Sequence, residues 1–216
     1  MGTLKTLAVF VVIISSVFIL TVGCATQGVK YSGFLEDYPA FEQGAKGGVD
    51  WAYVKEGVNF RKYHKILMDP VVFYFKKDAQ DQGIRADVLQ KMSSVFRQSV
   101  EEAVKGSYEM VDAPAKNVLR IRFAITEVVP SKESLVSFRA GAQAAGMRSY
   151  VNIGSASMEA EVLDSLTNER LAVAIDTQVG KELQSPGEVN TWQDTRDAFE
   201  FWAKRLRIWL DETHGK

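Results

Sequence analysis

The sequence predicts an α+β domain, with a mostly antiparallel sheet of about four to five strands and two main helices packed on one face. Its strand-like runs alternate apolar and polar residues, which is typical of a sheet with one buried and one solvated face. Two longer stretches instead repeat apolar residues at steps of three and four. The order along the chain is strand, helix, two strands, a hairpin and a helix.

The first predicted strand is 63–75, a run dense in β-branched and aromatic residues. We expect it to break near Asp69 and Pro70, because proline cannot donate to a strand ladder. An amphipathic helix is predicted next, because apolar or small residues recur at steps of three and four: Ile84, Val88, Met92, Val95, Phe96, Ser99 and Ala103. We expect this helix to end at Gly106.

Four further strands are predicted at 108–111, 118–129, 155–163 and 170–177. Turn-forming residues at 164–169 predict that the last two pair as an antiparallel hairpin. The inward-facing residues are expected to be Leu119, Ile121, Phe123, Ile125, Ala156, Met158, Ala160, Val162, Leu171, Val173 and Ile175.

Charged residues alternate with the apolar ones in two of these strands. If the strands at 118–129 and 155–163 are neighbours, Arg120 and Arg122 face Glu159 and Glu161 across the ladder. We interpret this cluster as the solvated face of the sheet and hold a ligand surface as the alternative.

The last helix begins at a predicted capping box, Thr191 to Asp194. Its apolar stripe carries three tryptophans and is expected to pack on the sheet, with a ligand-binding face as the alternative. The stripe consists of Trp192, Phe199, Trp202, Leu206 and Trp209.

The N-terminus has the layout of a secretory signal. One charge, Lys5, precedes an apolar run from Leu7 to Val22, and Gly23 stands before Cys24, the only cysteine. We predict a signal peptide at 1–23 and lipid on Cys24, with an uncleaved anchor or a buried structural cysteine as alternatives. The segment resembles a bacterial lipoprotein signal, and the resemblance implies that Ala25, rather than Asp, after the cysteine directs the protein to an outer-membrane anchor with the domain facing the periplasm.

We expect a lipidated cysteine and flexible tether over 24–50 and a single domain over 51–216. Between the glycine-rich parts of the tether, the aromatic segment 31–39 is expected to dock either on the domain or on a partner. Loss of Lys5 leaves 25 Lys and Arg against 27 Asp and Glu, a net charge of −2 that disfavours nucleic acid as a partner.

Segment 131–154 fits none of these elements and is either a contact loop or a short helix packed across the domain. With the last helix it supplies the candidate surface for a partner or ligand, formed by Phe138, Arg139, Gln143, Trp192 and Arg196. The expected partner is another envelope protein, and the oligomeric state is left open.

The sequence contains none of the common catalytic, metal-binding or nucleotide-binding motifs. The only histidines are His64 and His214, no His/Cys spacing suits a metal, and there is no nucleophile elbow, phosphate loop or dinucleotide fingerprint. We therefore expect neither enzymatic activity nor a cofactor. A hydrolase using Asp69, or Asp194 with Asp197, is the weakest alternative.

Several blocks resemble a bacterial lipoprotein family called domain of unknown function 3313, from about Tyr31 to the end of the chain. They are YSGFLEDY at 31–38, DPV at 69–71, EAEVLDS at 159–165, ERLA at 169–172 and WQDTRDAFEFWAKRL at 192–206. The resemblance implies an envelope lipoprotein with an α/β domain and brings no established activity. We expect a non-enzymatic, membrane-tethered binding or assembly module. The alternative is a carrier or sensor of a small apolar or lipid ligand, bound by Trp192, Trp202 and Trp209 under Phe138.

Overall fold

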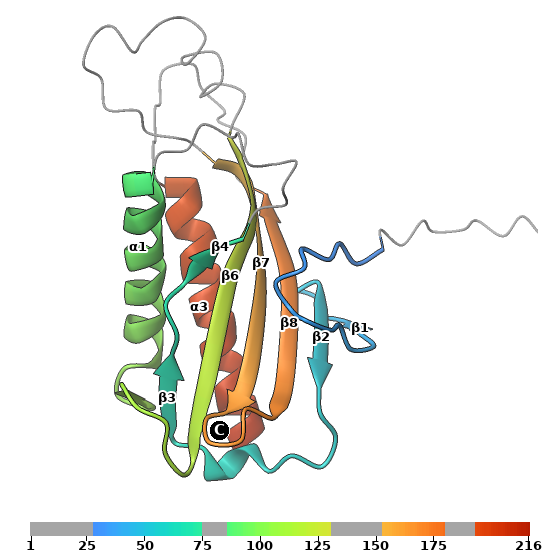
Figure 1. Cartoon of the computed structure of the whole chain (residues 1–216), viewed down its shortest axis with the longest axis vertical. Coiled ribbons are helices and arrows are strands. Elements are labelled where there is room, and N and C mark those ends of the chain that lie inside the picture. The colour runs from blue at the N-terminus through green and yellow to red at the C-terminus, as the bar shows by residue number, and fades with distance from the viewer. Residues whose placement is uncertain (1–27, 75–85, 131–152, 180–192) are drawn as a thin grey trace, which may run out of the picture.

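The computed structural model of the chain describes residues 28–74, 86–130, 153–179 and 193–216. These residues form one eight-stranded sheet with two long helices, α1 (Ala86–Val104) and α3 (Gln193–His214), on one face (Figure 1). The predicted α+β class and the pair of helices are confirmed. The predicted sheet was too small, and it is mixed rather than mostly antiparallel.

The strands lie in the order β1-β2-β8-β7-β6-β3-β5, and the short β4 also pairs with β6. Pairing is antiparallel from β1 to β6 and parallel where β6 meets β3 and β4 and where β3 meets β5. The strands are β1 (Glu42–Gln43), β2 (Trp51–Val54), β3 (Lys65–Met68), β4 (Val72–Phe73), β5 (Glu109–Val111), β6 (Val118–Pro130), β7 (Ile153–Asp164) and β8 (Arg170–Val179).

The parallel half of the sheet follows from the position of α1. This helix stands in the chain between β4 and β5, and a helical crossover returns the chain to the end of the sheet where the earlier strand began. β5 therefore runs in the same direction as β3. Lys65 pairs with both Glu109 and Val118, so the connection between β5 and β6 returns to the same end and β6 is parallel to β3 as well. The sequence analysis found this helix but not the parallel pairing that it produces.

Local boundaries were predicted well. The run 63–75 breaks into β3 and β4 around Asp69 and Pro70, and α1 ends before Gly106, whose φ of 75° suits a residue without a Cβ. The hairpin between β7 and β8 is confirmed. The short elements β1, β2 and the 3-10 helix η1 (Phe60–Lys62) were missed, and Thr191 of the predicted capping box lies outside the described residues.

The core lies between the helices and the central strands. Phe96 of α1 is the centre of an aromatic cluster, with ring centroids 4.9 Å from Phe123, 5.0 Å from Phe199 and 6.0 Å from Trp202. All four side chains are buried. The predicted inward residues of β6 and β7 belong to the same cluster, as do Ile66 and Met68 of β3.

The predicted orientation of the β8 side chains is wrong. Val173 and Ile175 are buried, but they lie opposite Glu161 and Glu159 on the side of the sheet away from the helices. The register shifts between Val162 and Leu163, and this bulge inserts Leu171 as an extra residue in β8. Beyond it the alternation is reversed, so that alanines of β8, not its β-branched residues, face the helices.

The face away from the helices is covered by the N-terminal segment 31–41, which lies on the domain (Figure 1). The Ser32 amide donates to Glu159 Oε1 at 2.8 Å, and the Tyr38 hydroxyl donates to Glu159 Oε2 at 2.9 Å. Asp37 pairs with Arg170 at 3.0 Å, and Leu35 is 2% exposed. The prediction of a solvated face is therefore wrong at its centre.

The predicted charge pairs are half right. Arg122 lies directly opposite Glu161 and binds it at 2.7 Å, and Arg170 binds the other oxygen of the same carboxylate at 2.6 Å. Arg120 lies opposite Leu163 and instead makes a bidentate ion pair with Asp69, in which Nη2 lies 2.7 Å from Oδ2. Glu161 is 3% exposed, and two guanidinium groups offset the cost of its burial.

Candidate functional site: an apolar pocket beside helix α3

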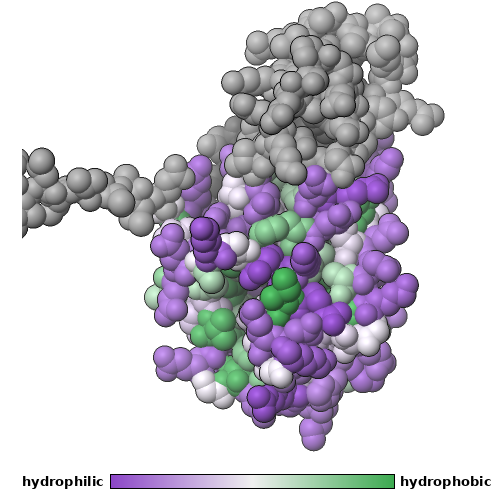
Figure 2. All heavy atoms as spheres, turned by 180° about the vertical axis from the view of Figure 1, so that it is seen from behind, coloured by the Kyte–Doolittle hydropathy of each residue, from purple (hydrophilic) through white to green (hydrophobic). Residues whose placement is uncertain are grey.

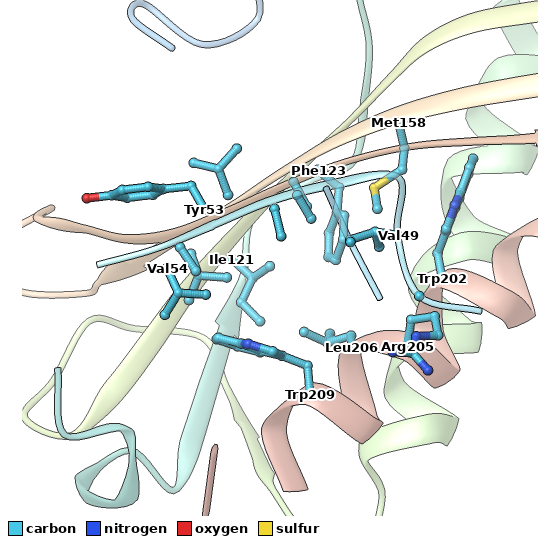
Figure 3. Close-up of a pocket in the computed structure, with 18 of the residues that line it drawn as sticks. Val49, Tyr53, Val54, Ile121, Phe123, Met158, Trp202, Arg205, Leu206 and Trp209 are labelled. Atoms are coloured by element: carbon cyan, nitrogen blue, oxygen red, sulfur yellow. The ribbon is translucent and has the colours of Figure 1, made fainter. Parts of the chain in front are cut away.

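A cavity of about 210 Å³ lies between α3 and the helix-side face of β7, β8 and β2 (Figure 3). On the sheet side, it is lined by four alanines of three neighbouring strands, namely Ala160 of β7, Ala172 and Ala174 of β8, and Ala52 of β2, and by larger apolar residues such as Phe123 and Met158. Because Ala174 pairs with both Ala160 and Ala52, the alanines form a continuous shallow floor. Larger side chains there would fill the space.

The helix side of the pocket is formed by Trp202, Leu206 and Trp209 (Figure 3). The rings of the two tryptophans are fixed by different contacts. Trp209 meets Phe60 of η1 edge to face at 5.0 Å, and the Trp202 indole donates to Asp176 Oδ2 at 2.7 Å. Both rings are thus held before any ligand binds.

Asp176 of β8 connects three elements around the pocket by hydrogen bonds: β8 itself, α3 and the loop before β2. Besides the Trp202 indole, its carboxylate accepts hydrogen bonds from the Gln178 side chain at 2.6 Å and from the Asp50 amide at 2.9 Å. Asp176 is 1% exposed, and burial raises the pKa of this carboxyl group above its ordinary value despite these donors. The residue connects β8 to α3 and to the loop before β2.

That loop, residues 44–50, closes one end of the pocket. The Gly44 amide donates to the Asp50 carbonyl at 2.9 Å, and a Cβ at Gly44 would stand 1.7 Å from the Val49 carbonyl oxygen. Only glycine allows this close approach of the backbone. The tight turn brings Val49 into the wall of the pocket.

Two charged side chains, Arg205 and Glu212, are among the residues that line the pocket. Arg205 Nη2 lies 3.3 Å from the position that a Cβ on Gly48 would occupy, so the guanidinium reaches across to the loop. No carboxylate in the described part of the chain forms an ion pair with it. The pocket is therefore apolar in its body, and its lining carries Glu212 and an Arg205 guanidinium that has no ion-pair partner among the described residues.

The size of the pocket limits what it can hold. An apolar cavity of about 150 Å³ accepts benzene, whereas sites for larger ligands measure about 300 to 1,000 Å³. With about 210 Å³, the pocket suits one ring system, a short alkyl chain or a single large side chain of another protein. Its described lining offers dispersion contacts, the Arg205 guanidinium and the Glu212 carboxylate.

The structure places the predicted site residues unevenly. Arg196 is exposed on α3, and the other members of that predicted set lie outside the described residues: Cys24, Phe138, Arg139, Gln143 and Trp192. Of the tryptophan stripe, Trp202 and Trp209 both line the pocket, and Trp202 is also buried in the core. The sequence analysis missed the alanine floor and Asp176.

Other features of the described residues bear on the remaining expectations. No group of three His, Cys, Asp or Glu side chains among them is arranged to hold a metal ion. Asp69, named for the hydrolase alternative, is bound by Arg120. Within the described ranges, no helix has both the length and the apolar character required to cross a membrane.

The family profile described as "Protein of unknown function (DUF3313)" matches residues 30–206. The chain belongs to this family. The resemblance seen in the sequence is thereby confirmed, and the DUF3313 match takes in all eight strands, α1 and α3 as far as Leu206. The alanine floor of the pocket lies within the DUF3313 match. No curated protein matches the sequence significantly.

Solved structures show only a distant likeness to the DUF3313 chain. The PelC dodecamer from Paraburkholderia phytofirmans is 8% identical with a TM-score of 0.41, over 71% of this chain and 96% of that one. A DUF4136 family protein from Bacteroides thetaiotaomicron is 9% identical with a TM-score of 0.39, over 74% and 95%. A DUF330 protein from Xanthomonas campestris is 8% identical with a TM-score of 0.40, over 70% and 85%.

Proposed function

We propose that this protein is a non-enzymatic binding module of the cell envelope, tethered to the outer membrane by lipid on Cys24 and facing the periplasm. The pocket beside α3 receives an apolar group of another envelope component. The observation that carries this proposal is the alanine floor beneath Trp202 and Trp209, which keeps a preformed apolar space open.

Binding there is favoured by the hydrophobic effect. Each methylene moved from water into an apolar site contributes about 0.8 kcal/mol, and little ordering is needed where the walls are already fixed. The Asp176 hydrogen bonds and the Trp209 contact with Phe60 provide such fixed walls. A protruding apolar side chain of a partner would be a suitable anchor, as in the central residues of protein interfaces.

A second candidate function is a carrier or sensor of a small apolar ligand. It is favoured by Arg205, because a guanidinium that forms no ion pair with the described residues can bind the anionic end of an amphiphile whose apolar body fills the pocket. The two functions share the pocket and differ in what occupies it.

Filling the pocket tests both functions. Ala174→Leu places a larger side chain on the floor, and Ala113→Leu, at an exposed position away from the pocket, is the matched control. We expect hexanol and hexanoate to perturb tryptophan fluorescence of the wild type and the control but not of Ala174→Leu. Arg205→Gln should weaken the binding of hexanoate and leave the binding of hexanol unchanged.

The identity of the occupant is tested by crosslinking in intact envelopes. A photoreactive residue at Val54, which lines the pocket and is 45% exposed, should capture a specific envelope protein, and Ala174→Leu should abolish that capture. If Val54 captures nothing and mass spectrometry of the purified protein shows a bound small molecule, the carrier function is favoured. Equal hexanol binding by Ala174→Leu and the wild type would refute both.

The membrane tether is tested at Cys24. Cys24→Ser should release the protein from membranes without changing its thermal unfolding, and the intact mass of the wild type should show a chain that begins at Cys24 and carries acyl groups. Continued membrane retention of the variant would favour an uncleaved anchor instead.

A further inference from the structure

Exposed apolar side chains gather around the N-terminal segment, away from the pocket. Among the described residues, five large hydrophobic side chains are strongly exposed, and three of them belong to this region: Tyr31 at 45%, Val72 at 40% and Tyr74 at 41%. Exposed aromatic side chains that cluster on one face are typical of an interaction site.

These side chains are connected by half-buried rings. Tyr31 stacks on Tyr38 with ring centroids 4.2 Å apart and lies 6.2 Å from Phe41, and Phe34 meets Tyr74 edge to face at 6.1 Å. The backbone of Gly33 joins the two groups, because its amide donates to the Tyr38 hydroxyl and its Cα side faces the Tyr74 ring. We call the set the aromatic patch: Tyr31, Phe34, Tyr38, Phe41, Val72 and Tyr74.

The patch lies on the side of the sheet opposite the helices. Val72 pairs with Ala124 of β6, and Arg122, two residues earlier on the same face, lies under the Phe34 ring at 4.9 Å. Leu35 and the hydrogen bonds to Glu159 hold the segment in place. The opposite side of the molecule is chiefly hydrophilic, with apolar side chains scattered among polar ones (Figure 2).

From these positions we infer that the aromatic patch rests on the lipid surface to which the chain is tethered. The inference depends on the proposed lipid at Cys24. Tyr31 follows Cys24 by seven positions, and a chain spans at most about 3.3 to 3.6 Å per residue, so Tyr31 lies within about 25 Å of the acylated residue. A lipid surface is therefore always within reach of this face.

Tyrosine suits this position because its ring enters the headgroup region while its hydroxyl stays hydrated. The charges around the patch are mixed: Lys30 precedes Tyr31, Glu36 is exposed, and Asp37 is paired with Arg170. Among the described residues around the patch, cations are not in excess, so these residues do not direct it to anionic lipids. Contact should therefore occur on zwitterionic bilayers and persist at high salt.

The test uses the full lipidated chain in vesicles of phosphatidylcholine and phosphatidylethanolamine. Because Cys24 is the only native cysteine and would be acylated, a thiol introduced elsewhere can be labelled alone with an environment-sensitive fluorophore. Tyr31→Cys and Tyr74→Cys probe the patch, and Gln98→Cys on the exposed side of α1 is the control. All three positions are exposed, and thermal unfolding of each variant compared with the wild type checks that the fold is retained.

We expect brominated lipids to quench the labels at positions 31 and 74, with a blue shift of their emission, and to leave the label at 98 unchanged. Equal weak quenching at all three positions, with the protein still on the vesicles, would overturn the inference and leave the tether intact. Protection of the labels at 31 and 74 in a soluble oligomer, independent of vesicles, would assign the patch to a second copy and also overturn it. Hexanol binding measured on the same samples reports on the pocket separately.

Discussion

Replacing Trp202 tests both the core and the pocket. The side chain is 1% exposed, lies 6.0 Å from the rings of Phe96 and Phe199, and donates its indole N–H to Asp176 at 2.7 Å. Trp202→Ala removes the whole indole ring from the core and leaves the buried carboxylate with one donor fewer.

The expected cost follows from these contacts. A tryptophan buries about 150 to 250 Å², and tryptophan-to-alanine changes in cores cost about 3 to 5 kcal/mol because the cavity does not close completely. Trp202→Phe keeps most of the ring packing and loses mainly the hydrogen bond to a charged acceptor, which contributes about 1.5 to 3 kcal/mol. The alanine variant should therefore lose more unfolding free energy than the phenylalanine variant.

Urea unfolding followed by circular dichroism measures both losses. A domain of this kind is stable by about 5 to 15 kcal/mol, so the alanine variant should be strongly destabilised or unfolded. If Trp202→Ala loses less than about 1 kcal/mol, the ring is not in the core, and the reasoning on both the core and the pocket wall fails. If Trp202→Phe matches the wild type, the Asp176 hydrogen bond contributes nothing.

Three further predictions concern other parts of the fold. Because burial raises the folded-state pKa of Asp176, the wild type loses unfolding free energy as pH rises through that pKa. Asp176→Asn removes this pH dependence, so urea titrations should show its stability improving relative to the wild type from about pH 4 to pH 7. A constant difference in stability between the two proteins would contradict this. The two ring nitrogens of His214 lie close to backbone carbonyls: Nδ1 is 2.6 Å from that of Leu210, and Nε2 is 2.7 Å from that of Tyr63. His214→Ala should therefore lower the unfolding free energy measured by chemical denaturation by about 1 to 3 kcal/mol. His64→Ala, at an exposed position, should change it very little. Leu35→Ala should cost about 2 to 5 kcal/mol and speed proteolysis of the N-terminal segment; unchanged proteolysis would mean that this segment is not held by Leu35.

Local patterns in the sequence were reliable wherever one element determines its own form. The three- and four-residue steps before Gly106 identify α1, the alternation in β6 and β7 identifies which residues face the helices, and Asp69-Pro70 marks the break between β3 and β4. In each case the signal lies within about a dozen neighbouring residues, which is the range over which periodicity operates.

The site was much harder to predict. Its floor consists of four alanines from three strands, and an alanine has no sequence signal that distinguishes a pocket from ordinary packing. Asp176 looked like one more polar residue of an alternating strand, although it joins β8, α3 and the loop at 44–50. The sequence placed Trp202 and Trp209 on one apolar stripe but did not show the different contacts that hold each ring.

The sequence by itself determined the α+β class, the two main helices, the β7–β8 hairpin and membership of the DUF3313 family, because these depend on local periodicity, turn chemistry and contiguous motifs. Only the tertiary structure decided the parallel half of the sheet, the reversed face of β8 and the burial of Glu159 and Glu161 beneath the N-terminal segment. Strand order and register join residues far apart in the chain, and a single bulge at Leu171 reverses every side chain beyond it. The energies that select these arrangements arise between segments, so no single segment contains them.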